Sequence, residues 1–499
     1  MSIEPSKLEA SEHDAESVSQ DWAPEEERRA RLKIDLSVLP LLCFGMIMFQ
    51  LDRMNLASAL TGGFTTDIGI TQDTVNLGNQ LMFMGIIVLE IPSNMLLQKI
   101  GPSKWIPAQV FVFGLIATMQ VFLRSRGGFL ATRILLGLAE AGYIPGSIYT
   151  LSTWYTPQEL GRRVAILFFG MFGGNAISPL LGAGILRLHG RGGMAGWKYI
   201  FLIEGIATMI VSGLLLLVLP TSPQRPRPLF LKGLIRFSER EQYILTARQG
   251  LENRSSADNK PRSGIPLATV RKTVLNYRRW PHFISTACVF ATWSPLTTYT
   301  PSIIMALGFT RVQANALSAI GASLTLPIVF TVAYLSDRTK RRGLTVICAI
   351  CTYLTVLIVA RCVLPHAGRW SRFGLWTVVN AFAVCYHPVH NVWVQLNCKD
   401  QAERSIAISM CMSMPSLMSI LHFVGRELIQ YTGVMSAISG LLAGTQIFRA
   451  DDSPRYHTGL IIMIALVSSG LVLAVTQHLI YLFLNSRQRR VGGKALYNP

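Results

Sequence analysis

Long apolar blocks separated by short polar segments form the dominant pattern of this chain. Each block contains about 20 mostly apolar residues, the length that a helix needs to cross the hydrocarbon core of a bilayer. Backbone N–H and C=O groups cannot stay unpaired in lipid, so such blocks must be helical. The pattern predicts an all-α membrane protein with twelve transmembrane helices, at residues 36–59, 76–97, 105–123, 129–152, 163–186, 198–219, 282–305, 314–335, 343–364, 373–396, one within 405–447, and 459–484.

The polar segments divide these helices into two bundles of six. The predicted regions are a tail at 1–34, a six-helix bundle at 35–220, a linker at 221–280, a second six-helix bundle at 281–485 and a tail at 486–499. The linker is rich in Pro, Arg, Lys and Ser, and an amphipathic helix is predicted near 238–251. Residues 405–447 are too long for one span and too short for two. We therefore expect an insertion around 411–432, which is either a true elaboration or a retained intron.

Composition and charge support a membrane protein. Half of the 499 residues are hydrophobic and 15% are charged, whereas soluble domains have about 25% charged residues. The net charge is +19, and Lys and Arg gather in the tails, the linker and alternate loops. By the positive-inside rule, both termini are cytosolic. Topology and attraction to anionic lipid explain the charge better than nucleic-acid binding does. The composition excludes an ordinary soluble enzyme, a disordered protein and a disulfide-stapled domain.

Several local motifs resemble those of one transporter superfamily. Residues 333–343 resemble the cytosolic G-x-x-x-D-R-x-x-R-R loop of the major facilitator superfamily, with Ala333 in place of the usual Gly. Further motifs resemble the anion:cation symporter branch and, within it, the fungal allantoate permease family; they lie at 51–56, 90–94, 133–146, 201–205 and 299–304. The resemblance extends over roughly 31–485. It implies the major facilitator fold, alternating access and a place in the plasma membrane.

Four ionisable residues lie inside the first and fourth predicted spans: Asp52, Arg53, Arg133 and Glu140. An ionisable group in the membrane is costly unless it has a partner or a function. Arg133 and Glu140 are seven residues apart and share a helix face. A carboxylate that binds an arginine in a bidentate manner would weaken the hold of that arginine on its acid, which could then take a proton. A permanent set of salt bridges that only fixes helix packing is the alternative interpretation.

The resemblance implies roles for these residues. Asp52 and Glu140 match proton sites of related symporters, and Arg53 and Arg133 match residues that bind the anion. The expected function is proton-coupled symport of a small organic anion, such as a carboxylate, a vitamin or an allantoate-like compound. The expected partners are therefore the anion, protons and the lipid bilayer, and the expected state is a monomer.

Other polar residues are candidates for the substrate cavity. Asn175 and Tyr299 are polar groups in the fifth and seventh predicted spans. His387 and Asn391 are four residues apart and face the same way on a helix. A histidine in a transport helix can relay protons or contact substrate, but a packed neutral histidine is equally expected.

Gating is predicted at the loop after the eighth span. We expect Asp337, Arg338 and Arg341 to act in gating rather than in substrate binding. Their charges would pin the cytosolic ends of the two neighbouring spans. The positive-inside rule alone would explain the arginines but not the aspartate.

Other functions on the same fold stay open. A sugar or drug facilitator or antiporter is the nearest alternative, although four buried charges argue against a plain sugar facilitator. A transport-dead nutrient sensor is a second alternative, which the short tails disfavour. No enzyme is predicted, because the sequence contains no H-E-x-x-H, G-x-S-x-G or P-loop motif. No cofactor or metal is implied, since the C-x-x-C pair at Cys348 and Cys351 lies on an apolar helix.

Overall fold

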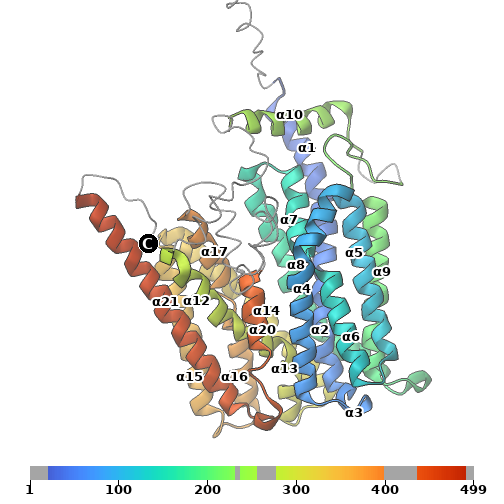
Figure 1. Ribbon diagram of the computed structural model, residues 1–499, viewed down its shortest axis with the longest axis vertical. Helices are drawn as coiled ribbons and strands as arrows, with labels where there is room; N and C mark the ends of the chain where they lie inside the picture. Colours follow the sequence, from blue (N-terminus) through green and yellow to red (C-terminus); the bar gives the residue numbers. More distant parts are fainter. Residues whose placement is uncertain (1–20, 231–235, 256–276, 398–434, 491–499) are drawn as a thin grey trace, which may run out of the picture.

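Long helices that run side by side in two groups form the protein (Figure 1). The computed structural model describes residues 21–230, 236–255, 277–397 and 435–490. The N-terminal group contains α2 (Leu39–Thr61), α4 (Gln72–Ile100), α5 (Pro102–Met119), α6 (Arg126–Glu140), α7 (Tyr143–Trp154), α8 (Pro157–Ile185) and α9 (Gly196–Val218). The C-terminal group contains α12 (Trp280–Ala291), α13 (Trp293–Ala306), α14 (Arg311–Thr339), α15 (Arg342–Val363), α16 (Arg369–Phe382), α17 (His387–Leu396), α20 (Met435–Gly444) and α21 (His457–Arg490).

The two ends of this bundle differ. One end carries α1 (Pro24–Ser37), α10 (Glu239–Ser255) and the last turn of α21, and is called the α10 end. The opposite end carries the short α3 (Phe64–Asp67), and is called the α3 end (Figure 1). The two groups meet where α8 packs against α14 and α2 packs against α13.

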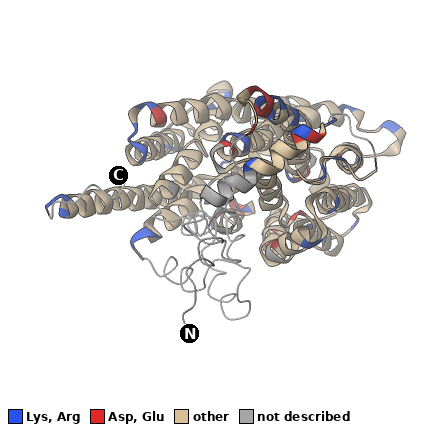
Figure 2. Ribbon diagram, turned by 90° about the horizontal axis from the view of Figure 1, so that it is seen from above, with Lys and Arg blue, Asp and Glu red and all other residues tan. Residues whose placement is uncertain are grey.

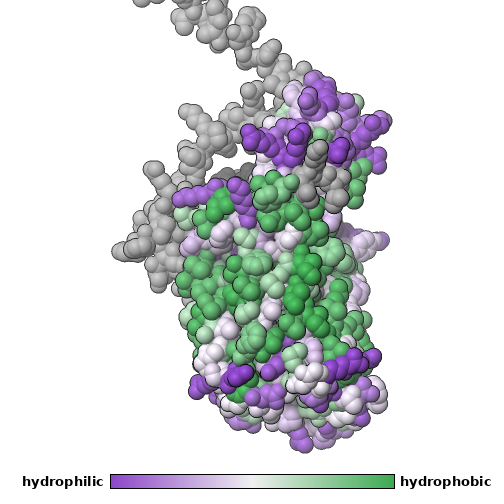
Figure 3. Space-filling view, turned by 90° about the vertical axis from the view of Figure 1, so that its right-hand side faces the viewer, coloured by the Kyte–Doolittle hydropathy of each residue, from purple (hydrophilic) through white to green (hydrophobic). Residues whose placement is uncertain are grey.

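The all-α, multi-span fold class is confirmed. Within the described residues, eight helical segments are long and apolar enough to cross a membrane, and α4, bent by 48° near Pro92, makes nine. Two more predicted spans appear as broken pairs, α12 with α13 and α16 with α17. Figure 3 shows a broad apolar belt between two hydrophilic ends. Large apolar side chains such as Phe122 and Phe483 are exposed on the surface of the described helices. The expected insertion at 411–432 lies outside the described residues.

A break in the fourth predicted span positions an acidic residue. The α6 helix ends at Glu140, and Gly142 starts α7 with φ +84°. A left-handed backbone conformation favours glycine, and a Cβ at this position would press against Ser93 and Asn94. The side-chain amide of Gln109 on α5 donates to the carbonyl oxygens on both sides of Glu140, at 3.0 and 2.6 Å. Gln109 therefore supplies hydrogen bonds to carbonyl groups that the break in the helix leaves free, and the Glu140 side chain faces inward.

The predicted linker helix exists as α10 and is attached to the N-terminal group. Lys33 of α1 forms an ion pair with Glu241 of α10 at 2.7 Å. Arg248 of α10, 5% exposed, donates to the Trp154 carbonyl at 2.9 Å and pairs with Glu159 at 3.3 Å. Figure 2 shows opposite charges gathered where α1 and α10 meet. We call these contacts the α10 ion-pair network.

The pKa of Glu241 reflects this network. Burial of the carboxyl raises its pKa, but hydrogen bonds from Lys33 and Ser238 outweigh burial and hold the pKa below the usual value of 4.5. The ionised carboxylate therefore helps to hold α10 in place. This contribution is complete above the usual pKa and is lost as the pH falls through the lowered one.

We expect Arg248→Ala to destabilise the protein. It removes a buried cation and leaves the Glu159 carboxylate and the Trp154 carbonyl without this donor, a loss of about 3 kcal/mol. The measurement is the midpoint of heat-induced unfolding of the purified protein in detergent. Arg240→Ala is the matched control, because Arg240 pairs with Asp21 at the exposed surface and such pairs contribute little. Equal midpoints for the two variants would contradict a structural role for Arg248.

Candidate functional site

A buried ion pair joins the first and fourth predicted spans. The Arg53 Nε on α2 donates to Glu140 Oε2 on α6 at 2.7 Å. The carboxylate is fully buried, whereas the arginine side chain is 15% exposed. The Arg53 guanidinium also lies over the Phe49 ring, with Cζ 4.2 Å from the ring centroid. The other oxygen of Glu140 has no partner among the described residues, so the pair has capacity for a further hydrogen bond.

Arg133 lies near this pair without joining it. The side chain is fully buried, and Glu140 attracts it electrostatically. Its Nη1 faces the Met82 sulfur at 3.8 Å, and its Cζ lies 5.4 Å from the centroid of the Phe129 ring. Its Nε and Nη2 have no partner in the described part of the chain. A buried guanidinium with free donors is suited to accept an anionic ligand.

Asp52 points to a different helix from its sequence neighbour Arg53. Its Oδ2 lies 3.1 Å from the Thr208 hydroxyl on α9. Its carboxylate is fully buried and is repelled by Glu140. The four charges that the sequence predicted as one set are therefore divided between an Arg53–Glu140 pair, a nearby Arg133 and an Asp52 that faces α9.

Two buried acids were missed as candidate site residues. Glu90 of α4 is 0% exposed and is attracted by Arg53. Glu204 of α9 is 2% exposed and lies close enough to Asp52 for the two carboxylates to repel each other. Both residues lie inside predicted apolar spans. Ionisable residues are costly in the membrane, so a search of every predicted span for such residues, instead of only two spans, would have identified both acids.

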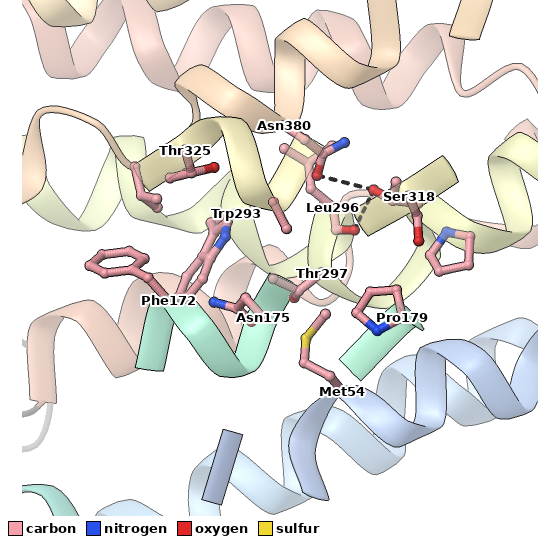
Figure 4. A pocket seen from close by; sticks show the side chains of 14 residues that line it. Met54, Phe172, Asn175, Pro179, Trp293, Leu296, Thr297, Ser318, Thr325 and Asn380 are labelled. Atoms are coloured by element: carbon pink, nitrogen blue, oxygen red, sulfur yellow. Dashed lines mark hydrogen bonds between the residues drawn. The ribbon is translucent and has the colours of Figure 1, made fainter. Parts of the chain in front are cut away.

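A pocket lined by apolar and uncharged polar side chains lies between the two helix groups (Figure 4). Side chains of α2, α8, α13, α14 and α16 line it, and no charged residue is among them in the described part of the chain. Its polar lining consists of Asn175, Thr297, Thr300, Ser318, Thr325 and Asn380. Asn175 accepts a hydrogen bond from Gln50 at 2.7 Å, and Thr300 donates to Asn380 at 3.1 Å. Of the predicted substrate-binding residues, Asn175 lies in this pocket.

Tyr299 lies outside the pocket lining, where the two groups contact each other at the α3 end. Its hydroxyl donates to the Asn76 side-chain oxygen at 2.5 Å, and the Asn76 amide donates to the Phe448 carbonyl at 2.8 Å. The Phe448 and Tyr456 rings stack with centroids 4.3 Å apart, and Gln72 donates to the Tyr456 hydroxyl at 3.2 Å. These five residues are called the α3-end seal.

His387 and Asn391 lie together on α17, as their spacing predicts. The His387 ring nitrogen Nε2 and the Asn391 amide are 3.1 Å apart. Neither residue lines the pocket. A second buried pair was not predicted: His282 of α12 and His390 of α17 are 2.9 Å apart through their ring nitrogens. The substrate-binding role of His387 and Asn391 stays a prediction.

The predicted gating residues lie at the exposed turn between α14 and α15. Asp337 bonds to Arg342 at 3.0 Å, while its side chain stays 69% exposed. Arg338 donates to the Tyr334 hydroxyl at 3.1 Å, and Arg341 is exposed. The Asp337–Arg342 bond joins the ends of the two helices across the turn. The gating role of Asp337, Arg338 and Arg341 stays a prediction.

The protein has two groups of membrane-length helices, a pocket between them and contacts that join the groups at the α3 end. This arrangement is that of a membrane transport protein. The chain belongs to the Major Facilitator Superfamily, which it matches over residues 42–421.

Individual relatives agree with this family. An uncharacterised transporter of Saccharomyces cerevisiae, YIL166C, is 27% identical over 94% of this chain and 82% of its own length. A protein of Agrobacterium vitis named "Putative tartrate transporter" is 28% identical over 72% of this chain and 76% of its own. Among solved structures, a bacterial homologue of the human lysosomal transporter Spinster superposes with a TM-score of 0.62 at 14% identity, covering 92% of this chain and 98% of its own.

We expect Asn76→Ala to weaken the α3-end seal. The change removes the hydrogen bonds to Tyr299 and to the Phe448 carbonyl, each worth about 1 kcal/mol. A cysteine placed in the pocket by Thr297→Cys, with the native cysteines replaced, should then react several-fold faster with a membrane-impermeant thiol reagent applied at the α3 end.

Ser469→Ala is the control for this experiment. Ser469 is exposed on α21, and its hydroxyl bonds only the backbone of its own helix, at 2.9 Å from the Ala465 carbonyl. Its loss should leave the labelling rate unchanged. Unchanged labelling in Asn76→Ala as well would show that these contacts do not close the pocket.

Proposed function

We propose that the protein is a proton-coupled symporter of a small organic anion. The observation that supports this proposal is the buried Arg53–Glu140 ion pair, 2.7 Å long, beside an Arg133 with unpartnered donors. Met54, the next residue after Arg53, lines the pocket between the two groups. Adjacent residues of α2 therefore contact the ion pair and the pocket.

The proposed coupling follows from the competition for Arg53. In the empty site, Glu140 is the partner of Arg53. A substrate carboxylate that binds the planar guanidinium in a bidentate manner would displace Glu140. The released carboxylate would then be an unpaired buried charge, a state that proton uptake from water relieves. Anion and proton would therefore bind together and be released together.

Arg133 is proposed as the second anion-binding group. Its free Nε and Nη2 can donate to a carboxylate without first breaking a hydrogen bond. Its complete burial means that the anion reaches it only after α4 and α6 move apart or after Arg53 has received the anion first. The substrate class is supported by the relative from Agrobacterium vitis, whose name assigns it tartrate, a dicarboxylate. The sequence motifs support the anion:cation symporter branch and the allantoate permease family.

The remaining predicted roles are part of the same proposal. Asp52 would be a second proton site, and Asn175 a substrate contact in the pocket. Tyr299, which the sequence predicted to bind substrate, is proposed here to close the substrate path at the α3 end. The bundles at 35–220 and 281–485 would move against each other in a monomer of the plasma membrane. Both termini would be cytosolic, so that the α10 end faces the cytosol.

One observation favours a second candidate function. The described lining of the pocket is made of amide, hydroxyl and apolar groups, with no charged side chain. Such a lining suits a neutral solute rich in hydroxyl groups, as a sugar facilitator would transport. A panel of labelled carboxylates and sugars, taken up by expressing cells with and without a protonophore, separates the two functions. Uptake of a sugar alone, insensitive to the protonophore, would reject anion symport.

We expect Glu140→Gln to abolish proton-driven accumulation while sparing exchange of labelled for unlabelled anion. The amide keeps the shape of the side chain but can neither pair with Arg53 as an ion nor titrate. The measurement compares accumulation under a pH gradient with exchange at equal pH in proteoliposomes. Glu239→Gln, a change at an exposed acid of α10, is the control. Equal accumulation by Glu140→Gln and the parent protein would refute the proton role.

We expect Arg133→Lys to raise the half-saturation concentration for the anion about ten-fold or more, since lysine cannot offer a planar fork of donors. The measurement is the concentration dependence of initial uptake. Arg126→Lys is the matched control, because Arg126 starts the same helix and is exposed. An unchanged half-saturation concentration in Arg133→Lys would count against anion binding by this residue.

A further inference from the structure

Asp52 of α2 and Glu204 of α9 face each other across a buried helix contact. Asp52 is 0% exposed and Glu204 is 2% exposed. The two carboxylates are close enough to repel each other. Neither carboxylate forms an ion pair within the described residues, and Asp52 Oδ1 and both oxygens of Glu204 lack any hydrogen-bond partner there. Thr208, one helical turn after Glu204 on α9, contacts Asp52 at 3.1 Å, so three carboxylate oxygens at this helix contact have neither a cation nor a donor among the described residues.

The charges around them cannot neutralise this pair. The middle of the described N-terminal group holds four buried acids, Asp52, Glu90, Glu140 and Glu204, and two arginines, Arg53 and Arg133. Both arginines lie on the side of Glu140: Arg53 pairs with it, and Arg133 is attracted by it. Besides Glu204, the described charged group that acts on Asp52 from another helix is Glu140, and it too repels Asp52. Four acids and two cations leave an excess of two negative charges unless protons are bound.

The hydrogen bonds of Thr208 point to a proton on Asp52. The Thr208 hydroxyl lies 3.1 Å from Asp52 Oδ2 and 3.0 Å from the Glu204 backbone carbonyl. A hydroxyl has one hydrogen to donate and two lone pairs to accept. If Asp52 is ionised, the carboxylate and the carbonyl compete for that hydrogen. If Asp52 is protonated, its O–H donates to Thr208, whose hydroxyl donates to the carbonyl, and both distances are explained.

We propose that Asp52 and Glu204 form a coupled pair of buried carboxyl groups that keeps at least one proton, and that Glu204 is thereby a proton-carrying residue of the transporter. Two unpaired carboxyl groups near each other cannot both ionise in a buried site, so the pair keeps a proton more strongly than either acid would alone. This inference rests on the proposed proton-coupled function. It adds a residue of α9 to the proton pathway, in which the sequence had indicated only α2 and α6.

The proton-carrying pair and the anion-binding arginines lie on different sides of α2. Arg53 reaches α6 and the anion-binding arginines, while the preceding residue, Asp52, reaches α9. A shift of α2 that frees Arg53 from Glu140 therefore also changes the distance between Asp52 and Glu204. Anion binding and proton release would be linked by the movement of one helix, without direct contact between anion and proton.

The first experiment measures the pair without any substrate. The infrared band of protonated carboxylic acid groups is recorded for the purified protein during a pH titration. We expect part of this band, present at neutral pH in the parent, to be lost in both Glu204→Gln and Asp52→Asn. Ser212→Ala is the control on the same helix, because its hydroxyl bonds the Pro107 carbonyl at 2.7 Å. If the band in Glu204→Gln titrates as in the parent, the proposal that this pair keeps a proton is wrong.

The second experiment measures the effect on transport. In Glu204→Gln the like charge beside Asp52 is absent, so the midpoint of the pH dependence of carboxylate uptake should move about one unit or more to the acidic side. Glu204→Asp, which keeps a carboxyl group, should restore part of the shift and guards against a folding defect. An unchanged midpoint in Glu204→Gln would overturn the proposal.

The two experiments separate this inference from the proposed function. If the parent accumulates no carboxylate under a pH gradient, the proposed function fails, and the infrared titration still decides whether the pair holds a proton. If the parent accumulates carboxylate but Glu204→Gln matches it in both band and midpoint, the function stands and the pair is refuted.

Discussion

The cost of burying charge in an apolar bundle is the constraint on which the organisation of the N-terminal group depends. Each buried ionised side chain needs an opposite charge, a set of hydrogen bonds or a proton. Arg53 and Glu140 meet this need through each other, at 2.7 Å. Arg133 meets it only in part, because two of its three nitrogens have no partner among the described residues. In the proposed symport, an anion would give Arg133 a partner and a proton would neutralise one of the buried acids.

The same constraint explains why the charges and the pocket are separate. The pocket lies between the two helix groups and is lined by apolar and uncharged polar side chains in the described residues, whereas the ion pair lies inside one group. Charges that line an interface between the groups would be alternately hydrated and buried if that interface opened and closed. Their place within one group keeps them away from the interface, and α2, which carries both Arg53 and Met54, connects the two places.

The helices could be predicted from the sequence because the length of an apolar block and the loss of backbone hydrogen bonds in lipid are local constraints. The helix expected near 238–251 is present as α10, but it is polar all round rather than amphipathic, and its ion pairs with α1 and α8 were not predicted. Partner choice could not be predicted, because it depends on helix rotation. Asp52 and Arg53 are adjacent in sequence, yet one faces α9 and the other α6. Tyr299 was predicted to bind substrate as a polar residue of the seventh span; its hydroxyl contacts Asn76 outside the pocket lining, and its role in binding stays a prediction.

The attachment of α10 also has a mechanical consequence. The chain that connects the two groups leaves α9 after Val218 and enters α12 at Trp280, but the ion pairs of Lys33 and Arg248 fix its first part to the N-terminal group. An extended chain spans at most roughly 3.5 Å per residue. The number of residues between the attached α10 helix and Trp280, rather than the length of the whole linker, therefore sets an upper limit on how far apart the two groups can lie.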